Sequence, residues 1–298
     1  MSPFIHLHVH TQYSVLDGQA SVTALVDKAI SDGMPGIAIT DHGNMFGIKE
    51  FYNYVKKKNS KVNDQIKEVK KSLEQAREQN NQDATEDLQK ELNALNSKIF
   101  KPIFGCEMYV AKESLHTHVD KKDTGRHLVV LAKNETGYHN LVKIVSQAWT
   151  EGFYSHPRTD KKALAEHHEG LIVCSACLGG EIPRLIQAGD IEEAEKQVKW
   201  FKDTFGDDYY IEIQRHKTNL PGANTEVFER QQEVNPELIR IARKFDIKIV
   251  ATNDVHFVNE DDADAHDRLI CVSTNKAVDD PMRMRYTKPV SYTHLRAH

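Results

Sequence analysis

The sequence lacks the long apolar segments that mark membrane and secreted proteins. It has no apolar run of the roughly 18 residues that a membrane-spanning helix needs, so no such helix and no membrane contact are expected. Its first residues, MSPFIHLHVHTQYS, show no basic segment followed by an apolar stretch, so no secretory signal is expected either. We therefore expect a cytoplasmic chain.

Cysteine is scarce, and basic charge is not in excess. The four cysteines are too few and too unevenly spaced for a disulfide framework, so we expect core thiols or metal ligands. The 39 Lys and Arg residues are outnumbered by 44 Asp and Glu residues, for a formal net charge of −5. Proteins that grip duplex DNA alone usually present a basic face, so this balance argues against unaided DNA binding.

The apolar residues that are present predict an α/β fold. A chain of 298 residues with 39% hydrophobic and 28% charged residues is typical of one large globular domain or two small ones. Amphipathic helical patterns, as at residues 21–31, 137–149 and 191–205, separate most of seven apolar segments. Such alternation predicts a parallel sheet, and seven units favour a closed, irregular barrel. The predicted strands are residues 4–9, 36–40, 102–111, 127–132, 170–175, 209–214 and 247–252.

Two parts of the chain do not follow this alternation. Residues 59–99 are highly charged, contain neither Gly nor Pro, and carry two apolar stripes on either side of a polar break at residues 80–83. They predict a two-helix antiparallel arm inserted between the second and third strands, with no catalytic part. The last ten residues, PVSYTHLRAH, continue no earlier pattern. We therefore expect one barrel domain over residues 1–287, with residues 288–298 either non-native or the start of another domain.

Histidine is abundant, with 16 residues, and three of them lie in the segment HLHVH. Alternate residues of a strand share a face, so His6, His8 and His10 are expected to point the same way. Three imidazoles on one face of an apolar segment would make an unusual core. They would make a suitable half of a metal site.

Further ligand-type residues lie at or near the ends of other predicted strands. They are Asp41 and His42, Cys106 and Glu107, His127, Cys174 and Cys177, and Asp254 and His256. In a parallel α/β barrel the C-terminal strand ends meet at one mouth, where active sites lie. The recurrence of such residues at strand ends predicts a site with several metal ions.

The types of donor indicate the metals and the reaction. Imidazoles and carboxylates with a cysteine suit Zn²⁺, Mn²⁺ or Fe²⁺ better than Ca²⁺ or Mg²⁺ alone, with Mg²⁺ as a further candidate. There are more donors than one tetrahedral ion takes, so two or three divalent ions are expected. Clustered ions roughly 3.5–4 Å apart activate water and hold the attacking and leaving oxygens of a phosphate ester. Phosphoester hydrolysis is therefore the favoured reaction.

Several motifs resemble those of a known family. HLHVHTQYSVLDG, AITDHGNMFGIKEFY, IFGCEMYVA, RHLVVLAKNETGYHNLVK, CSACLGGEIP and ATNDVHFV are similar to the PHP (polymerase and histidinol phosphatase) domain. More narrowly, they resemble the PHP domain at the N-terminus of bacterial DNA polymerase III alpha subunits. The resemblance covers about residues 3–287 apart from the arm. It implies a distorted seven-stranded (β/α) barrel, similar to a TIM barrel, with up to three metal ions.

The resemblance also implies a set of nine metal ligands, and a ligating residue occupies each position. Glu107 is the expected bridge between ions, and the catalytic residues are expected to be Asp254, His256, Glu107 and Asp17. The complete set favours a working metal site. The nine ligands are His8, His10, Asp17, His42, Glu107, His127, Cys177, Asp254 and His256.

The function that the resemblance implies is a metal-dependent 3′–5′ exonuclease. It would proofread the primer 3′ end of DNA within a replicative DNA-directed DNA polymerase, whose full-length form meets a sliding clamp and other replisome subunits. The palm carboxylates of such a polymerase are not in these residues, so this chain is not expected to polymerise. A small-molecule phosphatase and a non-catalytic, metal-stabilised domain stay open as alternatives. The motifs ITDHGNMFGIKEFY and ETGYHNL favour the polymerase branch.

Other residues receive lesser roles. Asp41 is expected to orient His42, and His6 to support the site from outside the nine ligands. Arg158 and Arg215 are candidates for contacting DNA phosphate. The remaining expectations are core thiols at Cys106, Cys174 and Cys271, and surface or capping roles for His116, His118, His139, His156, His167, His168, His216 and His266.

Overall fold

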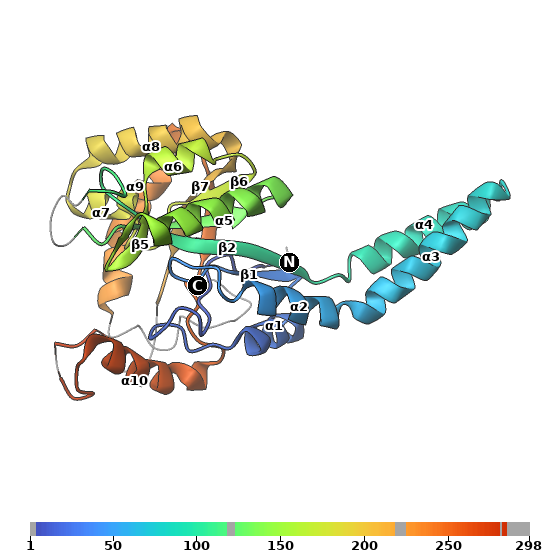
Figure 1. Cartoon of the computed structure of the whole chain (residues 1–298), viewed down its shortest axis with the longest axis horizontal. Helices are drawn as coiled ribbons and strands as arrows, with labels where there is room; N and C mark the ends of the chain where they lie inside the picture. Colours follow the sequence, from blue (N-terminus) through green and yellow to red (C-terminus); the bar gives the residue numbers. More distant parts are fainter. Residues whose placement is uncertain (1–3, 118–122, 218–224, 281, 285–298) are drawn as a thin grey trace.

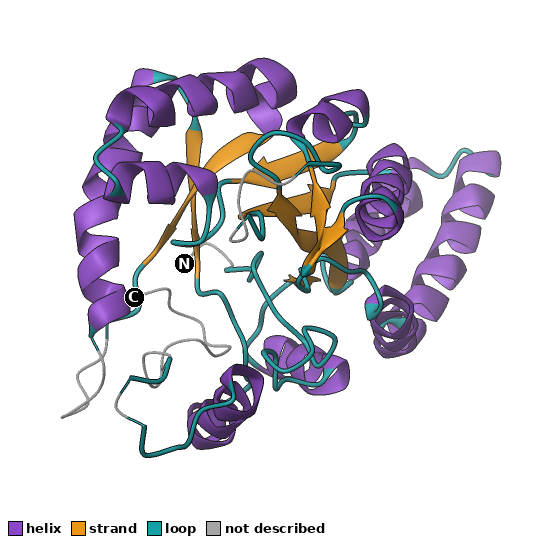
Figure 2. Ribbon diagram, turned by 60° about the vertical axis from the view of Figure 1, so that its left-hand side comes forward, coloured by secondary structure: helices purple, strands orange, loops and turns teal. Residues whose placement is uncertain are grey.

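The computed structural model describes residues 4–117, 123–217, 225–280 and 282–284, and strands lie inside a layer of helices (Figure 2). The strands are β1 (Gly36–Ile39), β2 (Lys101–Val110), β3 (Arg126–Ala132), β4 (Phe153–Tyr154), β5 (His156–Thr159), β6 (Leu171–Cys174), β7 (Tyr209–Gln214) and β8 (Lys248–Thr252). The helices are α1 (Val22–Ser31), α2 (Ile48–Lys58), α3 (Ser60–Glu78), α4 (Gln82–Asn96), α5 (Glu135–Thr150), α6 (Lys161–Glu166), α7 (Glu181–Gln187), α8 (Ile191–Phe205), α9 (Glu226–Lys244) and α10 (Ala263–Thr274). Two 3₁₀ turns, Gly206–Asp208 and Glu260–Asp262, precede β7 and α10.

The strands form one curled, mixed sheet in the order β4-β5-β2-β3-β6-β7-β8, with β1 paired to β2. The prediction of an α/β fold is confirmed, and six of the seven predicted strands are present. The short hairpin β4–β5 was not predicted. It adds β5 in parallel to the last residues of β2.

The prediction of an all-parallel sheet is wrong at β3. This strand runs antiparallel to both of its neighbours, β2 and β6. Parallel neighbours need a long crossover, usually a helix, whereas the described residues between β2 and β3 form no helix. The chain therefore returns alongside β2. As a result, the N-terminal end of β3 lies at the same rim as the C-terminal ends of the parallel strands.

The segment of residues 4–10 takes the place of the predicted first strand. It is not a regular strand, but its backbone forms hydrogen bonds with β1 at one edge of the sheet and with the segment that follows β8 at the other. On one side it accepts hydrogen bonds from Ala38 and Thr40, at 2.9 and 2.8 Å. On the other side His10 donates a backbone hydrogen bond of 2.7 Å to Val255, and Val255 donates one of 3.1 Å to His8. These four bonds close the curled sheet into a distorted barrel.

The two-residue period of the strands divides the sheet into an outer and an inner face. In β3, Val130 packs with the outer helices, whereas Val129 and Leu131 belong to a small apolar cluster with Ala38 and Cys174. The outer clusters are larger and pack α5, α8 and α9 on one part of the sheet and α1 and α2 on another. The small inner cluster fills one part of the barrel interior, and polar side chains occupy the rest. The predicted core position of Cys174 is confirmed.

The predicted helical hairpin is present as α3 and α4, and it projects away from the barrel (Figure 1). Its two apolar stripes meet, with Ile66, Val69 and Leu73 packing against Leu92 and Leu95. No described helix has the length and apolar character that crossing a bilayer requires. The predicted boundary after residue 287 falls outside the described residues.

Candidate metal centre

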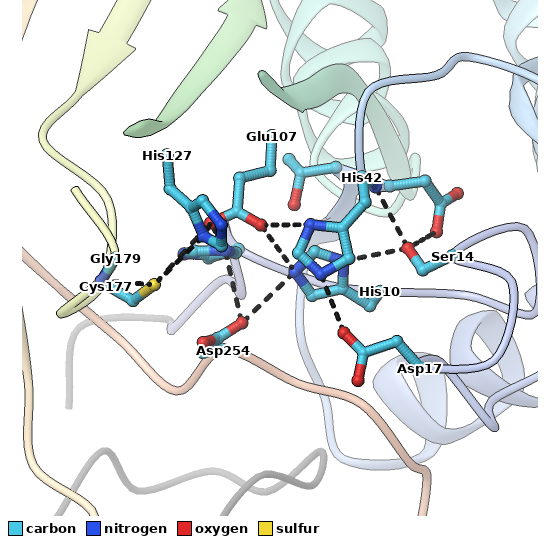
Figure 3. A network of polar contacts seen from close by, with 12 residues as sticks. His10, Ser14, Asp17, His42, Glu107, His127, Cys177, Gly179 and Asp254 are labelled. Atoms are coloured by element: carbon cyan, nitrogen blue, oxygen red, sulfur yellow. Dashed lines mark hydrogen bonds and ion pairs between the residues drawn. The ribbon is translucent and has the colours of Figure 1, made fainter. Parts of the chain in front are cut away.

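The site is built around the buried carboxylate of Glu107. Cys106 and Met108 pack on the outer face of β2, so the period of the strand turns Glu107 inward. One oxygen, Oε1, lies 3.1 Å from His8 Nε2 and 2.9 Å from His127 Nδ1. The other, Oε2, lies 2.7 Å from His42 Nδ1 and 3.4 Å from His10 Nε2. Each carboxylate oxygen of Glu107 thus faces a different pair of imidazoles (Figure 3).

Asp254, two residues after the end of β8, contacts both halves of the cluster. Its Oδ1 lies 3.2 Å from His8 Nε2 and 3.3 Å from His10 Nε2. His256, two residues later, is fully buried and stacks on His10 with ring centroids 4.4 Å apart. The two segments that close the barrel, residues 4–10 and the residues after β8, therefore contribute side chains to the same cluster.

Asp17 and Cys177 lie on opposite sides of this group (Figure 3). Asp17 Oδ2 lies 2.8 Å from His42 Nε2 and 3.2 Å from His256 Nε2. Cys177 Sγ lies 3.7 Å from Glu107 Oε1 and 3.6 Å from His127 Nδ1. The structure thus brings together all nine residues that the sequence singled out. His127 opens β3 and reaches the site only because that strand is antiparallel.

The backbone around the site adopts a conformation that residues with side chains rarely take. Leu16, Ala176 and Asp254 have φ values of 64°, 62° and 51°. Each is a site residue or directly precedes one. A left-handed conformation costs an L-residue roughly 1–2 kcal/mol, and such strain collects at functional sites.

Close contact with Gly179 supports His127. A Cβ added at Gly179 would lie 2.8 Å from His127 Nδ1, so only glycine leaves room for this ring. The backbone N–H of Gly179 also points to Cys177 Sγ, at 3.4 Å. The ACLGG sequence therefore positions a thiol and an imidazole together.

The charges of the cluster oppose one another. Burial would lower the pKa of His42, but the carboxylates of Glu107 and Asp17 outweigh it and raise this pKa to about 10. Burial, with the charges of His42 and His256, lowers the pKa of His10 to about 3. Burial would raise the pKa of Asp254, but its histidine neighbours hold it well below the usual range. Without a cation, protonated imidazoles thus balance the buried carboxylates.

Side chains that the sequence reading missed hold these histidines in place. Glu212 in β7 is fully buried, and its Oε1 lies 2.7 Å from His8 Nδ1. Ser14 Oγ lies 2.9 Å from His10 Nδ1 and donates to Asp41 at 2.7 Å. Glu212 could have been singled out from the sequence, because it is the one carboxylate in the otherwise apolar predicted strand YYIEIQ. No sequence pattern indicated Ser14.

The expectations for Asp41 and His6 need correction. Asp41 does not contact the His42 ring, because it accepts hydrogen bonds from Thr11 and Ser14, and Ser14 in turn accepts one from the His42 backbone. His6 does not share a face with His8 and His10, because the chain bends at His8 and the His6 ring packs edge-on against Phe4. His6 is buried nonetheless.

Two histidines expected at the surface are buried beside the site. His266 Nε2 lies 2.9 Å from the carbonyl oxygen of Asp17, and His216 Nε2 lies 2.9 Å from that of Asn253. His266 thus holds the backbone of Asp17, and His216 holds the backbone of Asn253, which directly precedes Asp254. They lie on α10 and after β7, and only the folded chain brings them here.

The donor atoms fit metal ions. His8 Nε2, His10 Nε2, His42 Nδ1, Glu107 Oε2 and Asp254 Oδ1 are buried and have no hydrogen-bond partner, although each lies within ion-pair distance of at least one of the others. Buried polar groups without such partners are rare, and these five atoms converge. Three groups of donors lie within 4.8 Å: His10 with His42 and His256, His8 with His10 and Glu107, and His42 with Glu107 and His127. Each of these groups of imidazoles and carboxylates could hold a metal ion.

Comparison with known proteins agrees with this geometry. The model of the PHP domain matches residues 6–216, which is more than half of the chain. The chain belongs to the PHP domain family. It is 38% identical to DNA polymerase III subunit alpha of Borreliella burgdorferi over 286 residues, 95% of this chain and 21% of that protein. The corresponding subunit of Thermus aquaticus is 38% identical over 288 residues, 95% of this chain and 20% of that protein.

The chain thus spans about a fifth of the length of these curated relatives. Among solved structures, an amidohydrolase of Chromobacterium violaceum aligns at 12% identity with a TM-score of 0.42, over 86% of this chain and 89% of that chain. A likeness at this level carries no information about function.

Seven of the nine metal-ligand candidates of this PHP domain line an open cavity of about 1200 Å³, whereas His8 and His10 are fully buried. Arg126 and Arg184 lie on its wall beside Cys177 and His127. Exposed aromatic side chains, Phe46, Trp149 and Phe153, contribute to another part of its lining. The cavity is larger than a single phosphate group requires.

The arginines expected to contact phosphate lie elsewhere. Arg158 is fully buried, pairs with Asp123 at 3.1 Å and donates to the carbonyl oxygens of Leu115 and Thr117, both at 3.2 Å. It holds the β2–β3 connection and cannot reach DNA, so that expectation is wrong. Arg215 lies over the ring of Phe228, at 5.8 Å, and does not line this cavity.

Proposed function

We propose that this PHP domain binds two or three divalent ions and hydrolyses phosphodiester bonds at DNA 3′ ends. The observation that carries the proposal is the convergence of five buried atoms that have no hydrogen-bond partner: Glu107 Oε2, Asp254 Oδ1 and one ring nitrogen each of His8, His10 and His42. The ions would be Zn²⁺, Mn²⁺ or Fe²⁺, or else Mg²⁺, given the mixture of imidazoles, carboxylates and a thiol. The proposed ligands are His8, His10, Asp17, His42, Glu107, His127, Cys177, Asp254 and His256.

Such ions would activate a water molecule and stabilise the charge that develops on phosphate oxygens. The protein residues supply the geometry for this chemistry. Glu107 faces both halves of the cluster, and Asp254 contacts both His8 and His10, so each carboxylate would hold ions together with histidines of both halves. Asp17 and His256 line the cavity and contact each other at 3.2 Å, so they would hold an ion on the side where a substrate phosphate enters. These four residues are the proposed catalytic residues.

The proposal of a DNA substrate rests on the relatives. The curated proteins that match are DNA polymerase III alpha subunits, so we infer that this domain serves the same replicative polymerase as a 3′–5′ exonuclease. Its partners would then be the primer 3′ end and, in the full-length protein, the sliding clamp and other replisome subunits. The size of the cavity favours a polynucleotide over a small phosphate ester.

A decisive experiment is digestion of a 3′-mismatched primer–template by the purified chain with Mn²⁺ or Zn²⁺. Asp254→Asn is the test variant, and Glu193→Gln, on the exposed face of α8, is the matched control. We expect loss of 3′-terminal nucleotides with the wild type and the control, and none with Asp254→Asn. If the wild type holds metal but digests nothing, the site is structural and the exonuclease proposal fails.

A further inference from the structure

Three large aromatic side chains lie exposed beside one another at the rim of the cavity. Phe46, Trp149 and Phe153 have exposed fractions of 60%, 40% and 55%. The ring centroid of Trp149 is 5.5 Å from that of Phe46 and 5.6 Å from that of Phe153. They come from the loop before α2, from α5 and from β4. Exposed, contiguous apolar surface of this kind marks an interaction site.

The central ring of this aromatic rim is fixed to the metal-ligand loop. Trp149 Nε1 donates a hydrogen bond of 2.8 Å to the carbonyl oxygen of Gly43. Gly43 directly follows His42, so the indole has a set position relative to the proposed metal ligands. A ring that is held in place loses little entropy when a flat ligand stacks on it.

A second series of rings leads from the metal-ligand candidates into the same cavity. Tyr109 stacks on His42 at 5.8 Å with an interplanar angle of 26°, and on His156 at 4.4 Å with an angle of 14°. Tyr109 and His156 line the cavity together with the aromatic rim. Flat rings therefore extend from the cluster outward.

Positive charge lies on the same cavity. Arg126 and Arg184 both line it, and burial together with the charge of Arg126 lowers the pKa of Arg184. No Asp or Glu in the described part of the chain forms an ion pair with either arginine. Neighbouring cations without an acidic partner favour an anionic ligand.

We propose that the aromatic rim of Phe46, Trp149 and Phe153 is a base-stacking subsite for single-stranded DNA that leads into the metal site. This inference rests on the proposed function and adds a substrate class, the single-stranded or frayed 3′ end. Single-strand binding sites combine aromatic faces for bases with cations for phosphates, and both occur here. In a paired duplex the faces of internal bases are covered by their neighbours, so only unpaired bases reach the rim.

The test uses the metal-free chain, held in chelator so that DNA stays intact. The chain has two tryptophans, so the variant Trp200→Phe leaves Trp149 as the only indole. Its fluorescence is followed during titration with a 12-nucleotide oligothymidine and with an abasic oligonucleotide of the same length. We expect oligothymidine to quench Trp149 and the abasic strand, which has the phosphates alone, to leave it unchanged. Equal responses to both strands would overturn the inference.

Phe46→Leu and Phe153→Leu keep an apolar side chain but remove the flat ring. Each is expected to weaken oligothymidine binding by about 5- to 140-fold, the range that one lost base–aromatic stack implies. Tyr52→Leu, which changes an exposed aromatic residue on α2 outside the cavity, is the matched control. Unchanged affinity in both Phe variants would overturn the inference and assign the rim to an apolar protein partner.

Hydrolysis of bis-p-nitrophenyl phosphate by the metal-loaded wild type separates this inference from the proposed function. This small diester reaches the metal-ligand candidates without needing the rim. If the diester is hydrolysed but oligothymidine and the abasic strand give equal responses, the stacking subsite is refuted and the proposed function stands. Absence of hydrolysis by the metal-loaded chain refutes the proposed function.

Discussion

Replacing Glu212 by glutamine is expected to weaken metal binding about tenfold while leaving every proposed ligand in place. The carboxylate lies 2.7 Å from His8 Nδ1, and both side chains are fully buried, so water cannot take over the contact. A hydrogen bond to a charged acceptor is roughly twice as strong as one between neutral groups, so glutamine loses about 1–1.5 kcal/mol. A loss of about 1.4 kcal/mol is a factor of ten in affinity.

The structure also predicts an effect on stability that must be measured separately. Gln214 Nε2 donates to Glu212 Oε1 at 3.0 Å, and Thr252 Oγ1 donates to the same atom, so the amide oxygen of glutamine must take this place. Its NH₂ group then occupies the position of Oε2, which has no hydrogen-bond partner. An unsatisfied buried donor costs about 1–3 kcal/mol of the free energy of unfolding.

The assay is competition for Zn²⁺ between the chain and a chromophoric chelator, under conditions in which the variant is folded. Urea unfolding of the metal-free chain measures the stability cost independently. Glu193→Gln, the same substitution on the exposed face of α8, controls for the loss of a negative charge. An affinity of Glu212→Gln within about twofold of the wild type would refute the reasoning that Glu212 strengthens His8 as a ligand.

Three further changes have expected outcomes. The pKa of His42 is raised to about 10, and a metal ion binds only the neutral ring. The apparent metal affinity should therefore rise with pH and level off above about pH 10. Chelator competition measures this affinity. Gly179→Ala places a Cβ 2.8 Å from His127 Nδ1, so it should lower the number of ions bound per chain, measured by elemental analysis after dialysis. Arg158→Ala removes one partner of a buried ion pair and should lower the free energy of unfolding by about 3–5 kcal/mol in urea titrations.

Each of these predictions has a control and a contrary result. The pH series is repeated with His139→Gln, an exposed histidine on α5, and a pH-independent affinity of the wild type would contradict the proton displacement. Unchanged metal content in Gly179→Ala would show that His127 is not a ligand. Arg158→Ala should keep its metal content while folded, and loss of less than about 1 kcal/mol would contradict the structural role of the arginine.

The sequence alone was sufficient for much of the secondary structure. The segments that became β2, β3 and β7 are short apolar runs of the kind that form largely buried strands, and the stripes of residues 59–99 have a helical period. Both patterns follow from local backbone geometry, so they are visible before the chain folds. The motifs also singled out all nine residues that the structure brings together around Glu107.

Only the tertiary structure decided how these elements are oriented and what surrounds them. A period shows which face of a strand is apolar, but neighbours and direction depend on how the chain returns, so the antiparallel β3 that delivers His127 was not predicted. Glu212 supports His8 from 204 positions away, and Arg158 is buried by a loop that follows another strand. Phe46, Trp149 and Phe153 form a rim only after a loop, a helix and a strand meet. Contacts between distant segments set these features, and local sequence patterns do not record them.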